Sequence, residues 1–196
     1  MPPAKTYYER HLPHWQPPGK ELSVTWRLAD SLPRLFWRSC KQPTDGRRFV
    51  EYDRALDAER YGPRWLREPR VAELMVQAFR HGEDVRQFYR LLAFVVMPNH
   101  VHLLLKANVP LQKITQSLKG FTAFQAHKVL GRRGEPFWQD ESFDHWVRNP
   151  VELNKILHYI ENNPVTAGLV PHPQDWPWSS AVFRKSYTAQ APQLSL

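Results

Sequence analysis

Cysteine is almost absent from this chain. Cys40 is the only cysteine among 196 residues, so the chain can form neither an internal disulfide nor a zinc site built on several thiolates. Small secreted proteins often depend on disulfides, whereas proteins kept in a reducing compartment do not. The composition therefore favours an intracellular protein, and we expect a cytoplasmic location.

Long hydrophobic runs are also missing. The apolar stretches are far shorter than the roughly 20 residues that cross a membrane as a helix. Residues 1–18 carry five prolines among aromatic residues instead of the basic and then apolar pattern of an export signal. With 42% hydrophobic residues, the chain is rich enough to fold and long enough for one domain. We therefore expect a soluble protein with no membrane partner.

Acidic residues are outnumbered. The chain has 27 Lys and Arg against 19 Asp and Glu, a formal net charge of +8. A basic globular domain attracts polyanions, of which nucleic acid is the commonest. The charge alone also fits a soluble, modestly basic protein with no such partner.

Hydrophobic periodicity divides the chain into elements. Leu22–Leu28 alternates apolar and polar residues, which predicts a half-buried strand. Residues 30–66 are rich in turn residues and form an insertion with one short helical piece near Asp53–Glu59. A helix is predicted over Pro69–His81, ended by Gly82, and another over Val151–Asn162, ended by Pro164 and Gly168. Two strands over Phe88–Met97 and His100–Lys106 are almost entirely apolar, which predicts central positions in the sheet. The remaining predicted elements are a helix over Leu111–Leu130 and a strand over Phe143–Val147.

This order of elements predicts an α+β fold, a ferredoxin-like sandwich with a central antiparallel sheet and helices in a single domain. We expect an irregular N-terminal arm over residues 1–20 and the functional domain over residues 21–172, with the insertion at about 30–66. Residues 173–196 are expected to form a loop-like C-terminal tail.

His100 and His102 form the most informative short pattern in the chain. They flank Val101 on an apolar stretch, and residues i and i+2 of a strand project from the same face. Two neutral imidazoles that point together are half of a site for a divalent metal. Two sheet histidines that are satisfied by their neighbours would give the same pattern, so the triplet alone does not separate the two interpretations.

The helix predicted from Val151 carries two polar residues at a suitable spacing. Tyr159 and Asn163 are four residues apart and therefore lie on one helical face. If this helix packs over the histidine strand, the amide oxygen of Asn163 would add a ligand to a set that suits Mg²⁺ or Mn²⁺. The phenol of Tyr159 would then face a phosphodiester that the metal polarises. Taken singly, Tyr159 also fits an ordinary core residue, and Asn163 fits the end of a helix.

Basic and aromatic side chains supply candidate DNA contacts. The two tryptophans of the Trp-Pro-Trp-Ser-Ser tail would stack on bases or form a hydrophobic plug. The paired arginines between Gly131 and Gly134 would lie in a solvated turn unless DNA is present. The candidates are Lys119, Arg132, Arg133, Arg148, Trp176 and Trp178.

Four segments in the same order resemble those of the single-tyrosine HUH transposases, and a fifth resembles the tail of their branch known as REP-associated tyrosine transposases. The resemblance covers about residues 88–184, with a weaker similarity near Val24 and Trp26. The matching segments are Met97–Leu104 with the His-hydrophobic-His motif, Ser117–Thr122, Phe137–Asp144, Tyr159–Val170 with the tyrosine-helix pattern, and the tail Trp176–Ser180.

This resemblance implies a site and a substrate. His100 and His102 would be metal ligands, Asn163 the third ligand and Tyr159 the nucleophile. The substrate would be single-stranded DNA with hairpins, such as palindromic repeats, cleaved and rejoined through a 5′-phosphotyrosine that leaves a free 3′-hydroxyl. The cofactor would be a divalent metal, Mg²⁺ or Mn²⁺.

Two other functions also fit the sequence. One is a domesticated hairpin-binding protein that no longer cuts DNA. The other is a metal-dependent nuclease in which water attacks and Tyr159 is structural. The sequence leaves open whether the chain acts alone or as a homodimer, and whether Tyr159 serves its own chain or a partner.

Overall fold

Four strands form one antiparallel sheet in the computed structural model, which describes residues 7–9, 13–15, 17, 19–33 and 46–188. The order across the sheet is β4-β5-β3-β6. Helix α3 (Pro69–Asp84) connects β3 to β4, and α4 (Leu111–Leu130) connects β5 to β6. This topology confirms the predicted ferredoxin-like sandwich. The strands are β3 (Glu21–Arg27), β4 (Tyr89–Val96), β5 (His100–Ala107) and β6 (Phe143–Trp146).

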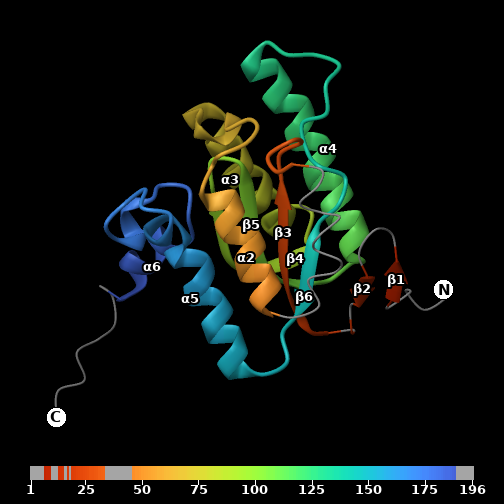
Figure 1. The fold of residues 1–196 in the computed structure, drawn as a ribbon. Helices are drawn as coiled ribbons and strands as arrows, with labels where there is room; N and C mark the ends of the chain where they lie inside the picture. Colours follow the sequence, from red (N-terminus) through yellow and green to blue (C-terminus); the bar gives the residue numbers. More distant parts are fainter. Residues whose placement is uncertain (1–6, 10–12, 16, 18, 34–45, 189–196) are drawn as a thin grey trace.

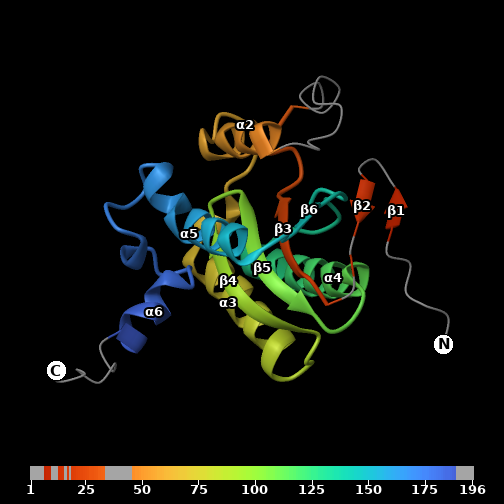
Figure 2. The same ribbon diagram turned by 90° about the horizontal axis from the view of Figure 1, so that it is seen from below.

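Different helices cover the two faces of the sheet. Figure 2 shows α3 and α4 on one side, and α5 (Pro150–Thr166) with α2 (Gly46–Asp57) on the other. Alternate residues of each strand enter the two cores, as the period of a strand requires. The α3–α4 side buries Val24, Trp26, Phe79, Val101 and Leu103, and the α5 side buries Ala93, Val95, Leu104 and Ile160.

Strand β3 is buried on both faces, so the prediction of a half-buried strand is wrong. Its polar residues Ser23, Thr25 and Arg27 are all buried. They face the side that α2 and α5 cover, where Arg27 contacts Tyr52 of α2. The polar face of β3 is therefore buried under α2 and α5 and is not exposed to solvent.

Both β4 and β5 were predicted to be central strands. Strand β5 is central, but β4 lies at an edge of the sheet. The C-terminal tail pairs with the last residues of this edge. Val95 and Ser179 form an antiparallel bridge, and the backbone N–H of Val96 donates to the carbonyl of Trp178 at 2.9 Å. The edge of a sheet has unpaired backbone N–H and C=O groups that can pair with an extended segment, and here the C-terminal tail forms these hydrogen bonds.

The tail is also more regular than predicted. It forms a short 3-10 helix, η2 (Pro173–Asp175), and then α6 (Ala181–Thr188), which Figure 1 shows beside α5 and away from α4. The loop-like prediction is wrong because Pro and Ser residues in this tail serve strand pairing and helix initiation instead of disrupting structure.

Two helices run past the glycine and the proline that were expected to end them. Helix α3 continues through Gly82, where an added Cβ would lie 2.3 Å from the hydroxyl of Tyr89. That hydroxyl donates to the carbonyl of Phe79 at 2.7 Å, so Gly82 allows a close approach of Tyr89 and is not a terminator. Helix α5 continues through Pro164 to Thr166, since a proline in the last turn removes only one hydrogen bond there. Gly168, with φ of 71°, follows the helix end as expected.

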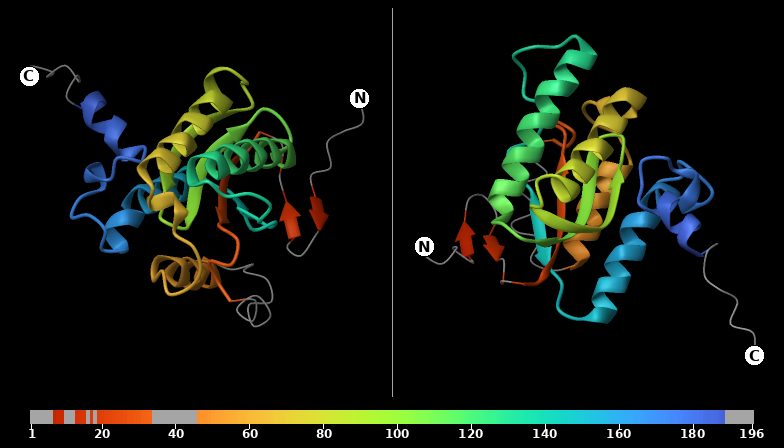
Figure 3. Two further views of the ribbon diagram at one scale, coloured as in Figure 1. Left: turned by 90° about the horizontal axis from the view of Figure 1, so that it is seen from above. Right: turned by 180° about the vertical axis from the view of Figure 1, so that it is seen from behind.

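The N-terminal arm contains a small two-stranded antiparallel sheet, where an irregular segment was expected. It consists of β1 (Tyr7–Glu9) and β2 (Pro13–Trp15), which Figure 3 shows at the end of the molecule away from α6. A 3-10 helix, η1 (Trp65–Arg67), precedes α3. Cys40 lies outside the described residues.

No helix in the described part of the chain is long and apolar enough to cross a membrane.

Candidate metal and tyrosine site

The histidine pair lies on the central strand β5 and points to the side that α2 and α5 cover. Both side chains are fully buried, and their Nε2 atoms are 3.0 Å apart. Their neighbour in the strand, Val101, points to the opposite core. The i and i+2 spacing thus brings the two imidazoles together, as the strand period predicts.

Each imidazole is oriented through its other nitrogen. His100 Nδ1 donates to the side-chain oxygen of Asn99 at 2.6 Å, and His102 Nδ1 is 2.7 Å from the hydroxyl oxygen of Thr25 on β3. Contacts of this kind fix the ring and leave Nε2 as the ligand atom. Burial, with the neighbouring His102, lowers the pKa of His100 to about 3, so its imidazole is neutral near pH 7. The neutral form is the one that binds metals.

Helix α2 brings a carboxylate to the same point. Asp53 is fully buried, and its Oδ1 lies 3.2 Å from His102 Nε2 and 3.5 Å from His100 Nε2. The three ligand atoms lie within 4.8 Å of one another, so Asp53, His100 and His102 form a group that could hold a metal ion. Burial alone would raise the pKa of Asp53, but the imidazoles and the hydroxyl of Tyr159 outweigh it and hold this pKa below its ordinary value.

Helix α5 places Tyr159 and Asn163 on the other oxygen of this carboxylate. The hydroxyl of Tyr159 donates to Asp53 Oδ2, and Asn163 Nδ2 donates to the same atom at 3.0 Å. The ring centroids of Tyr159 and His102 are 6.2 Å apart. Burial and the charge of Asp53 raise the pKa of Tyr159, so its phenol stays protonated in this arrangement.

Three buried oxygen atoms around the histidines have no hydrogen-bond partner. They are Asp53 Oδ1, Asp57 Oδ1 and Asn163 Oδ1. Asp57 lies one turn beyond Asp53, with its Oδ1 3.8 Å from His100 Nε2, and burial with the charge of Asp53 raises its pKa to about 7. Buried polar atoms without partners are costly and rare, and a cation at the histidine pair would satisfy Asp53 Oδ1. Two imidazoles with carboxylate and amide oxygens form a donor set that fits a divalent metal.

Sequence reasoning missed four residues of this site. Asp53 and Asp57 lie in the insertion to which no role was assigned, and the available signal was their spacing of four on a helical piece. Asn99 was taken as a turn residue, although its place before the histidine strand allows it to orient His100. Thr25 was placed on a solvated face. Asn163 contacts Asp53, and its role as a ligand stays a prediction.

The predicted basic DNA contacts differ in their surroundings. Lys119 Nζ donates to the backbone carbonyls of residues 139, 140 and 141 at 2.8, 2.9 and 3.2 Å. Arg132 pairs with Glu135 and lies 4.5 Å above the ring of Trp65. Arg133 and Arg148 are exposed. Lys119 therefore has a structural role, and the DNA contacts of all four residues stay predictions.

The two tail tryptophans pack against the sheet. Trp176 donates its indole N–H to the carbonyl of Val96 at 2.9 Å, and its ring meets that of Trp178 edge-on at 5.1 Å. Both are half-buried, Trp176 against the α5-side core and Trp178 against the α3–α4-side core. This arrangement supports the plug interpretation, while base stacking stays a prediction.

Replacing Trp176 by alanine is expected to destabilise the fold more than it weakens DNA binding. Loss of a half-buried indole and its hydrogen bond would cost about 2–3 kcal/mol of unfolding free energy. Urea unfolding and a hairpin-binding titration on the same preparation would separate the two effects. An unchanged unfolding midpoint with a large loss of DNA affinity would favour a stacking role instead.

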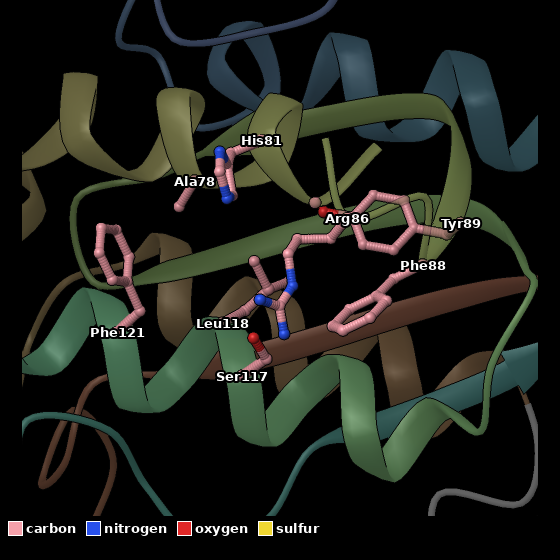
Figure 4. Close-up of a pocket in the computed structure, with 9 residues that line it drawn as sticks. Ala78, His81, Arg86, Phe88, Tyr89, Ser117, Leu118 and Phe121 are labelled. Carbon is pink, nitrogen blue, oxygen red and sulfur yellow. The ribbon is translucent and has the colours of Figure 1, made fainter. Parts of the chain in front are cut away.

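A cavity elsewhere on the described part of the chain lacks this chemistry. One of about 250 Å³ lies between α3 and α4, on the face opposite the histidine pair. Figure 4 shows its lining, in which Arg86 and Phe88 from the segment between α3 and β4, with Tyr89 at the start of β4, face Ser117, Leu118 and Phe121 of α4. Its lining is largely apolar and holds one histidine, His81, so the candidate site remains the group around His100 and His102.

Three comparisons with known proteins bear on this site. Residues 67–163 match the model of the family described as transposase IS200 like. A Haemophilus influenzae protein named as a REP-associated tyrosine transposase is 29% identical over 104 residues, which are 47% of this chain and 58% of that protein. A second H. influenzae protein, uncharacterized, is 29% identical over 108 residues, 60% of its length. The chain thus spans less than two thirds of the two curated relatives.

A solved structure shares the fold. It is described as a REP-associated tyrosine transposase bound to a REP hairpin, and it is 19% identical with a TM-score of 0.56. The match covers 94% of this chain and 87% of the other. The family-matched segment includes His100, His102, Tyr159 and Asn163, whereas Asp53 and Asp57 lie before it.

Proposed function

We propose that this chain, whose residues 67–163 match the IS200-like transposase family, cleaves and rejoins single-stranded hairpin DNA through a phosphotyrosine at Tyr159. The observation that carries the proposal is the meeting of Tyr159 with the histidine pair across one carboxylate. Asp53 faces both imidazole Nε2 atoms with one oxygen and accepts the hydroxyl of Tyr159 with the other. A structural core tyrosine would need no such neighbour.

The chemistry assigned to Tyr159 is a transesterification. Its phenol oxygen attacks the phosphorus of a DNA phosphodiester, a bond forms between phosphorus and that oxygen, and the bond to the 3′-oxygen of the preceding nucleotide breaks. The leaving oxygen takes up a proton and becomes a 3′-hydroxyl, while Asp53 Oδ2 is in place to accept the proton of Tyr159. The phosphotyrosine retains the energy of the phosphodiester, so a second 3′-hydroxyl can reverse the step without ATP.

His100 and His102 would hold a divalent cation, with Asn163 as the predicted third ligand. When bound, the cation polarises a phosphate oxygen and offsets the negative charge near Tyr159. Asn99 and Thr25 keep the two imidazoles in their ligand orientation. Tyr159 lies beside the histidines of its own chain, which supports action in cis.

The choice of hairpin DNA rests on charge and on the similar proteins. A net charge of +8 suits a polyanion, and the matched solved structure is described as bound to a REP hairpin. The test is to incubate the chain with end-labelled hairpin oligonucleotides and Mn²⁺ or Mg²⁺ and to separate the products on a denaturing protein gel. A labelled band at the mass of protein plus DNA supports the proposal. Cleavage without that band would indicate attack by water, and binding without cleavage would indicate a protein that only recognises hairpins.

DNA binding should weaken steeply as salt is added. Each phosphate that the chain neutralises contributes a slope of about −0.7 for single strands to the plot of log affinity against log salt. Contacts with four to six phosphates would give a total slope of roughly −3 to −4. Fluorescence anisotropy with a hairpin in EDTA at several KCl concentrations measures this slope. A slope near zero would contradict binding through a basic surface.

A further inference from the structure

Helix α2 is an addition to the family-matched segment, yet it reaches the centre of the candidate site. The family match begins at residue 67, and α2 ends at Asp57. The side chain of Asp53 is fully buried between the histidine strand and α5. Figure 2 shows α2 lying next to α5 on the same side of the sheet.

The oxygen that Asp53 presents to the histidines has no hydrogen-bond partner. A fully buried carboxylate oxygen in this state is strongly unfavourable unless a positive charge lies beside it. The Nδ1 atoms of the histidines contact Asn99 and Thr25, so their Nε2 atoms point to the same place. When each neutral imidazole carries its proton on Nδ1, both Nε2 atoms offer lone pairs, and three electron-donating atoms then converge in the arrangement of a cation site.

The spacing of these atoms matches a metal site. Adjacent ligands of an octahedral ion at about 2.1 Å are about 3.0 Å apart. The two Nε2 atoms are 3.0 Å apart, and Asp53 Oδ1 lies 3.2 and 3.5 Å from them. All three distances are close to that of one face of an octahedron.

Among the described residues, α2 also contacts the rest of the protein through Tyr52, which contacts Arg27 of β3. Its Tyr52 and Leu56 pack with Leu32 in a small hydrophobic cluster separate from the two cores of the sheet. A hydrogen bond of 2.9 Å joins Asn99 Nδ2 to the carbonyl of Leu56. A metal bond through Asp53 would add to these contacts and fasten the helix more firmly.

We propose that Asp53 is a metal ligand supplied by α2, and that the cation fastens this helix over the hydroxyl of Tyr159 until DNA enters. This inference rests on the metal site of the proposed function and deepens it. The Asp53 oxygen that accepts Tyr159 occupies the place from which the phenol must turn to meet a phosphorus atom. Substrate therefore competes with α2 for Tyr159, and the metal sets the strength of that competition.

Calorimetric titration of Mn²⁺ into metal-free protein, without DNA, tests the ligand directly. Asp53→Asn should weaken Mn²⁺ binding at least tenfold, an effect on the order of that seen for groups supporting a metal site. Glu51→Gln is the matched control, because it removes the same charge from an exposed position on the same helix, and it should stay within about twofold. Equal Mn²⁺ affinity in the wild type and Asp53→Asn would overturn the proposal.

A second measurement uses only the wild type and so does not depend on the folding of a variant. Amide hydrogen exchange over residues 51–57 should slow at least about tenfold when Mn²⁺ is added. Unchanged exchange of α2 would also overturn the proposal. The covalent-adduct gel separates this inference from the proposed function. If the adduct forms but Asp53→Asn binds Mn²⁺ as tightly as the wild type, only the assignment of Asp53 as a metal ligand is refuted. If Mn²⁺ binding depends on Asp53 but no adduct forms, only the transesterification is refuted.

Discussion

Tyr159→Phe is expected to abolish formation of the covalent protein–DNA adduct and to reduce hairpin cleavage at least about 10³-fold. The phenylalanine ring fills the same space but has no oxygen to bond to phosphorus. The change removes one hydrogen bond to Asp53, so the expected loss in folding stability is only about 1 kcal/mol. Adduct formation and cleavage would be measured on the same labelled hairpin with Mn²⁺, after a thermal melt shows that the variant is folded.

Tyr61→Phe is the matched control, because Tyr61 is 52% exposed and loses the same hydroxyl. It should form the adduct at the rate of the wild type. DNA binding by Tyr159→Phe in EDTA should also be unchanged, since the phenol is directed at Asp53. Cleavage at full rate by Tyr159→Phe would show that water is the nucleophile and that Tyr159 is structural.

His102→Ala is expected to reduce Mn²⁺-dependent cleavage at least about 100-fold while hairpin affinity in EDTA stays within about threefold. His102 supplies one of two converging Nε2 atoms, so its loss leaves a site with too few ligands. It is fully buried, so the side chain itself is not expected to contact DNA when no metal is bound. His100→Ala should have the same effect, because both imidazoles face one point.

His158→Ala is the control for this pair, since His158 is exposed on α5 next to Tyr159. Its cleavage rate should equal that of the wild type. The His102→Ala variant needs a check of secondary structure by circular dichroism, because it opens a gap beside Thr25. Full activity of a folded His102→Ala variant would contradict a metal site at the histidine pair.

Local periodicity was enough to predict the sheet and the two faces that meet at the site. The apolar strands, the spacing of two in His100 and His102 and the spacing of four in Tyr159 and Asn163 are properties of neighbouring residues. Strand and helix geometry then decide which side chains share a face. The family resemblance covered this same part of the chain.

Asp53 could not be predicted in this way, because it reaches the histidines through a tertiary contact 47 residues along the chain from His100. The spacing of four between Asp53 and Asp57 indicates one helical face, but it does not show that this face meets a strand that follows much later in the chain. Gly82 and Pro164 failed as helix ends for a related reason. Tyr89 explains Gly82 only when the strand packs on α3, and the position of Pro164 in the last turn makes its lost hydrogen bond tolerable.

The alternating pattern of β3 led to the wrong prediction that its polar face is exposed to solvent. Alternation in a sequence separates the two faces of a strand but does not say that the polar one is solvated. Here Thr25 lies opposite His102 in the strand register and contacts its Nδ1 atom. Polar residues on a strand beside a suspected metal strand are therefore candidates for orienting its ligands.

The most direct test of the account is to locate the bond between protein and DNA. The tryptic peptide Ile156–Arg184 contains Tyr159 as its only tyrosine. Wild-type protein would be incubated with hairpin DNA and Mn²⁺, digested with nuclease and trypsin, and analysed by tandem mass spectrometry. The account predicts a 5′-nucleotide remnant on Tyr159 of this peptide. Cleaved DNA with that peptide unmodified, or with the remnant on another residue, would contradict it.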